Sequence, residues 1–339
     1  MSRIAFVSNS YSGGGAELAS RAVSASLASH MDDLTFIAIN DFPDDGLRPN
    51  VRSILIGRKY RGSIPDLIKS VVKFRKIITN LETELVVLNC ELPEFFSLFL
   101  PRRIKRVVVE HTTKPWSRLP FLGVLVRQAL KQQGAEWVAV SDISKIWPFR
   151  STKITVIPNP LVNQPEKVLF PFTKIERIYF VGRLVDSKHP EMILWASLDT
   201  ALPAIIIGEG NLGSALQEFS GRNSINADFI GHSSQPWSLL KSGDIVIVPS
   251  AYEGDGLVVA EAILSGAPIL LRDCPDLRRF NLPEMNYFID YHVLLNRIRE
   301  FGLQVDCLIP SQDIRNDLIN ARGIEQVGSK WQDLISKLI

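Results

Sequence analysis

Cysteine is scarce in this chain, and long hydrophobic runs are missing. The 339 residues include 3 cysteines, Cys90, Cys274 and Cys307, whose odd number and wide spacing exclude a disulfide framework and a CxxC zinc pair. Apolar runs such as residues 95–100 are far shorter than the roughly 20 residues that a membrane-spanning helix needs. The first ten residues, MSRIAFVSNS, hold one basic residue and lead straight into a strand-like run, unlike a signal peptide. We therefore expect a cytoplasmic protein.

Charge is nearly balanced overall but unevenly distributed along the chain. The formal net charge is +2, yet residues 1–160 hold 22 lysines and arginines against 14 aspartates and glutamates, whereas the rest holds 16 against 22. Either the first half meets an anionic partner, or the asymmetry is only that of a solvated surface. Nucleic acid is not the expected partner, because the basic residues form no recognisable groove-reading motif.

Short runs of β-branched and aliphatic residues alternate with segments whose apolar residues recur at helical spacing. Before the proline- and asparagine-rich stretch 158–171, strands are expected at residues 4–8, 34–39, 51–56, 85–88, 106–110, 137–140 and 153–157, and helices at 17–27, 65–79 and 119–132. After it, strands are expected at 177–181, 204–207, 228–230, 244–248 and 268–271, and helices at 190–198, 211–219 and 257–264.

This alternation predicts an α/β protein with two tandem Rossmann-like, doubly wound domains that face a cleft. We place the N-terminal domain at residues 1–160 and the C-terminal domain at residues 161–323. The amphipathic segment 324–339 either closes the second domain or packs back on the first.

The most informative motif of the second half follows the expected strand 244–248. It places Glu253 before a turn flanked by Gly254 and Gly256, and a helix that begins at Leu257 carries Glu261 eight residues after Glu253. Glycines let the backbone approach a ligand closely, and the amides of a helix start suit an anion such as a diphosphate. The two carboxylates are candidate acceptors for sugar and ribose hydroxyl groups. The alternative is an acidic N-cap turn with a solvated glutamate behind it.

A second strand–turn–helix motif contains Gly182 and two cations. Arg183 and Lys188 lie five residues apart in the loop, where a guanidinium and an ammonium group could together neutralise a diphosphate. The alternative is a pair of solvated surface cations.

In order and spacing, these motifs resemble the retaining glycosyltransferases of family 4, which have the GT-B fold. That family combines a Gly-Arg-Leu turn and a following lysine with a Glu-x7-Glu pair, here Glu253 and Glu261. Further matches are the glycine-rich run 13–17, the segment 140–142 and the strand 156–160. The resemblance extends over most of the chain.

The resemblance implies roles for individual residues. Arg183 and Lys188 would bind the donor diphosphate and stabilise the leaving group, Glu253 would contact the transferred sugar, and Glu261 would hold the ribose. His111 matches a histidine that the family places near the anomeric centre; its alternative is a polar strand-end residue. The remaining donor-binding positions implied by the family are Gly14, Gly15, Gly182, Gly208, Gly210, Gly254, Asp255, Gly256 and Leu257.

The implied reaction retains the anomeric configuration and needs no metal. Departure of the leaving group and attack on the same face is the favoured route, and a covalent intermediate on Glu253 is the less favoured one. No Asp-x-Asp triplet that would chelate Mg²⁺ is present, which agrees with a metal-independent mechanism. The chain departs from the family at Asp255, where an apolar residue is usual, and at His189, which follows the lysine. We hypothesise that Asp255 reads a donor-sugar hydroxyl or amide group.

Two other functions stay open at this point. Gly208-x-Gly210-x-x-Gly213 satisfies the dinucleotide fingerprint, and Asp228 follows 20 residues after Gly208, so an NAD(P)-dependent oxidoreductase is the rival enzyme. A non-catalytic sugar-nucleotide-binding partner on the same fold is the third possibility, because fold does not fix function.

The acceptor is expected to contact the first domain. In this family the acceptor is a glycan or a lipid-linked sugar, which suggests a role in bacterial surface polysaccharide or lipopolysaccharide synthesis. UDP is the expected donor nucleotide, and no cofactor is expected. Cations in segments 69–76 and 102–106 and the apolar segment 116–127 suggest contact with an anionic membrane surface at the inner face of the membrane. The alternative is that these aromatic residues are ordinary core and the acceptor is soluble.

Overall fold

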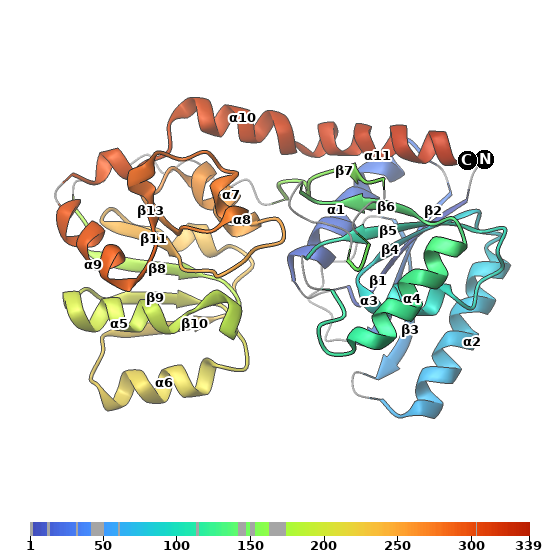
Figure 1. Ribbon diagram of the computed structural model, residues 1–339, viewed down its shortest axis with the longest axis horizontal. Helices are drawn as coiled ribbons and strands as arrows, with labels where there is room; N and C mark the ends of the chain where they lie inside the picture. Colours follow the sequence, from blue (N-terminus) through green and yellow to red (C-terminus); the bar gives the residue numbers. More distant parts are fainter. Residues whose placement is uncertain are drawn as a thin grey trace. The chain divides into compact units, whose positions relative to one another are not determined.

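The computed structural model describes residues 3–11, 14–31, 33–41, 51–59, 62–112, 115–141, 147–149, 153–162, 174–302 and 304–339. It divides into two compact units, Met1–Val162 with Asn320–Ile339, and Asn163–Ile319. Each unit is an α/β domain built on one parallel sheet (Figure 1). Most of the expected linker, Gly13 of the glycine-rich run and Asp142 of segment 140–142 lie outside the described residues.

The first unit has a seven-stranded sheet in the order β3-β2-β1-β4-β5-β6-β7. Its strands are β1 (Ile4–Ser8), β2 (Leu34–Asp41), β3 (Arg52–Lys59), β4 (Leu85–Asn89), β5 (Lys105–Glu110), β6 (Glu136–Ala139) and β7 (Thr155–Val156). Its helices are α1 (Gly15–Ala28), α2 (Ile64–Asn80), α3 (Glu91–Ser97), α4 (Pro120–Gln132) and α11 (Ile324–Leu338).

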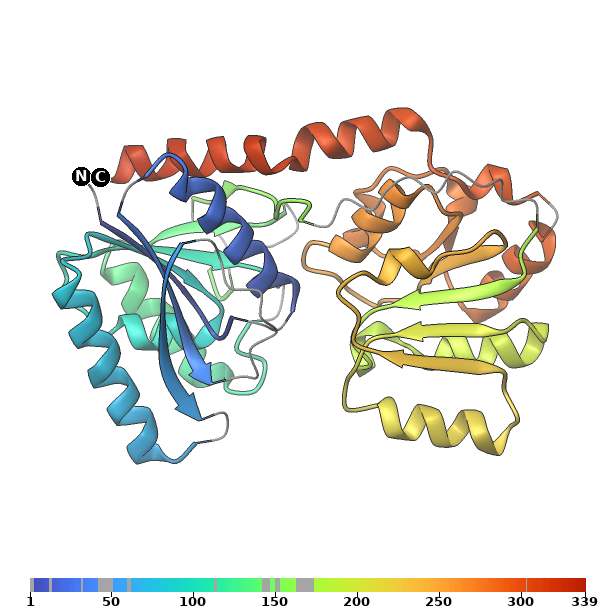
Figure 2. The same cartoon turned by 180° about the vertical axis from the view of Figure 1, so that it is seen from behind.

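Helices cover both faces of this sheet, so its central strands are apolar on both sides. Every residue of β1 and β4 is buried, as expected for parallel strands between two helical layers. Helices α2, α3 and α4 contribute to one hydrophobic cluster, and α1 and α11 contribute to the other. Trp331 of α11 packs edge-on against Phe6 of β1, with 5.9 Å between ring centroids. The C-terminal helix therefore packs on the first unit, beside α1 (Figure 2).

The second unit has a six-stranded sheet in the order β10-β9-β8-β11-β12-β13. Its strands are β8 (Arg177–Val181), β9 (Ala204–Ile207), β10 (Ala227–Gly231), β11 (Asp244–Val248), β12 (Ile269–Arg272) and β13 (Tyr287–Phe288). The helices are α5 (Glu191–Thr200), α6 (Gly213–Arg222), α7 (Leu257–Ser265), α8 (Pro275–Arg278), α9 (Tyr291–Glu300) and α10 (Gln312–Arg322), which spans the boundary between the units in the sequence. The 3₁₀ turns are η1 (Asp186–Lys188), η2 (Pro236–Leu239), η3 (Glu284–Asn286) and η4 (Val305–Leu308).

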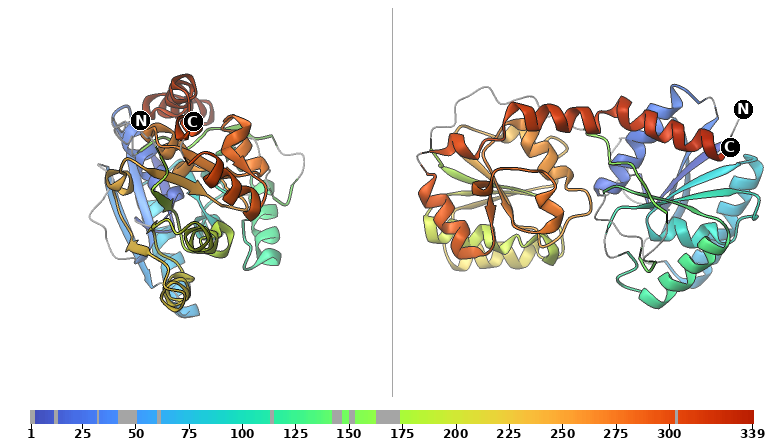
Figure 3. Two further views of the ribbon diagram at one scale, coloured as in Figure 1. Left: turned by 90° about the vertical axis from the view of Figure 1, so that its left-hand side faces the viewer. Right: turned by 45° about the horizontal axis from the view of Figure 1, so that its top comes forward.

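The strand order of the second unit fixes where its helices lie. From β8 the chain moves to β9 and β10 in one direction, and then returns to place β11 on the other side of β8. Because parallel crossovers are right-handed, the helices of the two directions cover opposite faces. Accordingly, α5 and α6 lie on one face and α7 on the other (Figures 1 and 3). The order reverses between β8 and β11, which is where open parallel sheets bind ligands.

Candidate active site

The two motifs of the second half follow the two strands at this reversal. The turn after β8 runs from Gly182 to Lys188, and the turn after β11 runs from Pro249 to Gly256. The backbone N–H of Ala251 donates a hydrogen bond of 3.0 Å to the Ser187 carbonyl, which joins the turns directly. Residues that are distant in sequence therefore meet at the carboxyl end of the sheet.

An ion pair links the predicted catalytic carboxylate to the predicted phosphate-binding lysine. The ammonium of Lys188 donates to Oε1 of Glu253, and the two side chains are 18% and 10% exposed. The backbone N–H of Glu253 donates to Oδ2 of Asp276 at 2.9 Å, so its main chain is held as well. Arg183 is exposed in the same turn as Lys188. Charge of both signs is thus concentrated at the reversal of the strand order.

The glycine turn after Glu253 is shaped for close backbone packing. Gly256 is the N-cap of α7 with φ +64°, and a Cβ there would lie 3.0 Å from the Phe280 ring. The guanidinium of Arg279 donates to the Gly254 carbonyl at 2.9 Å. Asp255 is buried in this turn. Because α7 starts at Leu257 and the N–H groups of its first turn have no acceptor within the helix, this end of the helix favours an anion.

Glu261 lies on the second turn of α7, with only 7% of its surface exposed. Its Oε2 accepts a hydrogen bond of 2.9 Å from the indole N–H of Trp237, which lies in η2. Trp237 is buried beside Tyr179 of β8, with 6.4 Å between the ring centroids. The second carboxylate of the pair is therefore held in place by an aromatic residue that the sequence motifs did not indicate.

The glycine run after β9 has a structural explanation that the dinucleotide interpretation does not need. Gly208 has φ +138°, and a Cβ there would lie 1.9 Å from the Gly182 carbonyl oxygen. At Gly210 a Cβ would lie 2.2 Å from the Leu184 carbonyl oxygen, and the Leu184 N–H bonds the Glu209 carbonyl. These glycines let the turns after β8 and β9 pack backbone to backbone. The run also follows the second strand of the unit, whereas the dinucleotide fingerprint follows the first.

Three predicted residues belong to the first unit. Gly14 is the N-cap of α1, where its N–H donates to Oε2 of Glu17 at 2.9 Å, and Gly15 is the first residue of that helix. His111 directly follows β5, and its Nε2–H donates to Oδ1 of Asn89 at 3.0 Å. The amide of Asn89 is oriented by its Nδ2, which donates to the Ser20 hydroxyl at 2.8 Å and to the carbonyl of Val7, the residue that precedes the end of β1.

His111 is therefore held as a neutral ring with its proton on Nε2. Its Nδ1 is buried and has no hydrogen-bond partner within the described part of the chain. Burial lowers the pKa of the imidazole to about 4, because charging the ring without water is unfavourable. His111 lies at the end of β5, next to β4 in the sheet, and so close to the reversal of strand order between β1 and β4.

Comparison with known proteins identifies the enzyme class. Residues 165–317 match the family model described as glycosyl transferases group 1. An uncharacterized glycosyltransferase of Haemophilus influenzae is 24% identical over 355 residues, covering 97% of this chain and 98% of that protein. The UDP-Gal:alpha-D-GlcNAc-diphosphoundecaprenol alpha-1,3-galactosyltransferase of Escherichia coli is 26% identical over 225 residues, 55% of each chain. The crystal structure of Anabaena HepE with UDP and glucose aligns with a TM-score of 0.83 at 16% identity, covering 99% of this chain and 100% of that chain.

This chain is a glycosyltransferase with the GT-B fold. The predicted fold and enzyme class are both confirmed. The rival oxidoreductase interpretation is wrong, and its glycine run has the packing role described above.

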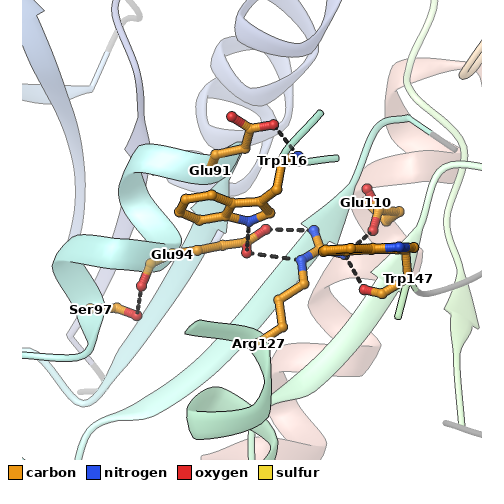
Figure 4. Close-up of polar contacts among 7 residues, drawn as sticks. All are labelled: Glu91, Glu94, Ser97, Glu110, Trp116, Arg127 and Trp147. Carbon is orange, nitrogen blue, oxygen red and sulfur yellow. Dashed lines mark hydrogen bonds and ion pairs between the residues drawn. The ribbon is translucent and has the colours of Figure 1, made fainter. Parts of the chain in front are cut away.

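The first unit of the glycosyltransferase encloses a charged network that sequence reasoning missed. Arg127 of α4 is 1% exposed and binds both oxygens of Glu94 on α3, at 2.7 and 3.0 Å (Figure 4). The same guanidinium donates to Glu110 at 2.5 Å and to the Trp147 carbonyl at 2.7 Å. The indole of Trp116 donates to Glu94 at 2.9 Å. Burial raises the pKa of Glu110 to about 7, against the lowering effect of the arginine.

Two helices of the first unit expose apolar side chains. On α2, Ile64, Ile68 and Val72 form a stripe at four-residue spacing and are 74%, 58% and 62% exposed. On α4, Phe121 and Leu125 are 86% and 68% exposed.

The apolar segment 116–127, which was expected at a membrane surface, is exposed only in part. Trp116 is a core residue, whereas Phe121 is 86% exposed. Among the described residues, no helix is both long and apolar enough to cross a membrane. The same residues contain no cluster of three or more His, Cys, Asp or Glu side chains that could hold a metal ion.

Proposed function

We propose that this glycosyltransferase is a retaining, metal-independent enzyme of family 4 that transfers a sugar from a UDP-sugar to a hydroxyl group of a glycan or glycolipid. The observation that carries the proposal is the contact between Lys188 and Glu253 at the reversal of the second sheet. It joins the Gly-Arg-Leu turn to the Glu-x7-Glu segment, two motifs separated in sequence.

The donor diphosphate takes the cationic turn after β8. Arg183 and Lys188 neutralise the two phosphates, and the amides that begin α7 add hydrogen bonds to the same group. Glu261 accepts hydrogen bonds from the ribose hydroxyl groups, and Glu253 accepts one from a hydroxyl group of the transferred sugar. In the second unit, the glycines at 182, 208, 210, 254 and 256 and Leu257 form the backbone around the donor.

Transfer breaks the bond between the anomeric carbon and the phosphate oxygen, and it forms a bond from that carbon to the acceptor oxygen. The acceptor proton passes to the departing phosphate oxygen, so attack and departure use the same face and the configuration is retained. Fixed cations and amides stabilise the charge that develops on the leaving diphosphate, which is the task of a metal ion in other enzymes. On the first unit, neutral His111 offers an uncharged ring nitrogen to a sugar hydroxyl group.

Relatives support the donor and acceptor classes. The E. coli relative is named for transfer from UDP-Gal to a sugar on diphosphoundecaprenol, and HepE has been solved with UDP-glucose. We therefore assign the chain to bacterial surface polysaccharide or lipopolysaccharide synthesis at the cytoplasmic face of the inner membrane.

We also propose that the first unit touches an anionic membrane through α2 and α4. An apolar face flanked by cations suits such a surface, since the side chains enter the interface and the cations bind lipid phosphates. On α2 the exposed cations include Lys69, Arg75 and Lys76.

Introducing glutamate at Phe121 and Leu125 should abolish flotation with liposomes of anionic lipid at low salt. The matched control is Ile289→Glu, at an apolar position of the second unit that is 65% exposed. Equal flotation of both variants would contradict membrane contact.

The donor proposal is tested by thermal shift in the presence of EDTA with UDP, GDP, ADP, their sugars, NAD and NADP. A ligand at 100 times its dissociation constant should stabilise the protein by about 2.7 kcal/mol. We expect a shift with UDP and one UDP-sugar that is lost in Arg183→Ala. A shift with NAD alone would overturn the proposal.

Two further measurements test its finer parts. The proton coupling at the anomeric centre of the product, read by NMR, reports retention or inversion. Asp255→Asn should change the preference among UDP-sugars, because we assign to this carboxylate the reading of a hydroxyl or amide of the sugar; an unchanged preference would remove that role.

A further inference from the structure

The contact between Trp237 and Glu261 stands outside the motifs from which the donor site was derived. Trp237 comes from η2, in the connection between β10 and β11, whereas Glu261 comes from α7, which follows β11. Both side chains are buried, with 6% and 7% of their surfaces exposed. The hydrogen bond between them therefore joins two separate segments behind the proposed ribose position.

Trp237 is itself rigidly placed. The hydroxyl of Tyr179 donates to the carbonyl of Pro236, and the Tyr179 ring lies beside the indole. Tyr179 is fully buried in the middle of β8, the strand that leads into the turn of Arg183 and Lys188. The indole is thus fixed by the same strand that positions the proposed phosphate-binding residues.

The chemistry of the pair limits what Trp237 can do. An indole N–H only donates, and it satisfies one of the roughly four acceptor positions of a carboxylate. The indole carries no charge, so it orients the carboxylate and does not neutralise it, whereas a lysine or arginine would do both. A buried carboxylate with one oxygen fixed in this way has a defined plane, which suits it to accept hydrogen bonds from two adjacent hydroxyl groups.

We propose that Trp237 is a positioning residue of the donor site, whose indole N–H holds the Glu261 carboxylate in the orientation that accepts the ribose hydroxyls. The inference rests on the proposed ribose-binding role of Glu261. It adds that the discrimination for ribose depends on a residue that does not touch the nucleotide.

The test compares the affinities of UDP and 2′,3′-dideoxy-UDP by calorimetry in the full-length protein and in Trp237→Phe. Phenylalanine keeps an aromatic ring and removes the N–H. We expect wild-type protein to prefer UDP at least about tenfold, since hydrogen bonds to a charged group are among the stronger ones. In Trp237→Phe, UDP should bind about tenfold more weakly while dideoxy-UDP is unchanged, so the preference collapses. Trp195→Phe, at a residue of α5 that is 41% exposed, is the matched control and should keep it.

The outcomes separate this inference from the function on which it rests. A preference kept in Trp237→Phe, or equal weakening of both nucleotides, would overturn the positioning role alone. Wild-type protein that binds the two nucleotides equally would overturn the ribose role of Glu261 and the present inference with it. If Trp237→Phe does not fold, 3-benzothienylalanine at position 237 replaces the N–H by sulfur in a ring of the same shape and serves the same comparison.

Discussion

Removing the arginine at the centre of the buried network should destabilise the first unit strongly. In Arg127→Met, the carboxylates of Glu94 and Glu110 lose their cation while they stay buried, at 1% and 2% side-chain exposure. Breaking a buried pair by removing one partner costs about 3–5 kcal/mol. For a domain of this size, each kcal/mol lowers the melting temperature by about 2–4 °C, so we expect a decrease of about 6–20 °C.

The pH dependence of this loss has a definite sign. Without the arginine, no cation opposes the effects of burial and of carboxylate repulsion, so the pKa values of Glu94 and Glu110 rise further above the unfolded value of about 4.3. The native state then binds more protons than the unfolded state between these values, and stability falls as pH rises. The difference between wild type and Arg127→Met should therefore be larger at pH 8 than at pH 5.5.

Differential scanning calorimetry at both pH values measures this effect, and two variants control it. Arg222→Met removes an ion pair whose side chains are 75% and 60% exposed, and it should change stability by less than about 1 kcal/mol. Adding Glu94→Gln and Glu110→Gln to Arg127→Met removes the buried charges and should restore most of the loss. A triple variant as unstable as the single one would refute the electrostatic explanation.

Three further predictions concern the site. As pH falls from 6.5 to 4, the free energy of unfolding of the wild type should decrease by about 2–3 kcal/mol more than that of His111→Asn. The reason is that the unfolded imidazole binds a proton in this window and the folded one does not. An equal decrease in both proteins would contradict this prediction. Gly208→Ala should cost about 2–4 kcal/mol in urea unfolding through overpacking and a positive φ, whereas Gly221→Ala, on a helix with open space around it, should be neutral or stabilising. Glu253→Gln should bind UDP about 2–5-fold more tightly in calorimetry, since the carboxylate that competes with the diphosphate for Lys188 is removed. Sugar transfer should be lost in this variant. Weaker binding of UDP would exclude competition between Glu253 and the diphosphate.

The sequence predicted the buried parallel strands well. The bounds expected at residues 4–8, 177–181 and 244–248 agree with β1, β8 and β11, because such strands are continuous apolar runs that end at turn residues. Short elements were missed. Helix α3 spans only Glu91–Ser97, and it begins after Cys90 at φ +74°, a conformation that no local pattern indicates.

The site could be predicted only where its residues are close in sequence. Spacing indicated Glu253 and Glu261 on one turn and helix, yet the contact of Glu253 with Lys188 depends on β8 and β11 being neighbours. A single sequence does not report that pairing. Trp237 and Asn89 were missed because neither belongs to a spaced motif. Each contacts its site residue, Glu261 or His111, through a hydrogen bond between segments that are distant in sequence. A polar residue at the end of a buried strand was the one available signal for Asn89.

The electrostatics of the two sheets argue for the division of labour between the units. At the strand reversal of the second unit, Lys188 lies against the carboxylate of Glu253 near the amides that begin α7, and the cation and the amides suit a diphosphate. At that of the first unit, burial and then the nearby carboxylates of Glu17 and Glu94 raise the pKa of the Cys90 thiol, and burial keeps His111 neutral. This edge disfavours an anion and suits hydroxyl groups, as found on a sugar. The excess of cations in the first half includes exposed residues of α2, on which the membrane proposal rests. These local charges therefore support the proposal that the donor nucleotide binds to the second unit and the acceptor to the first.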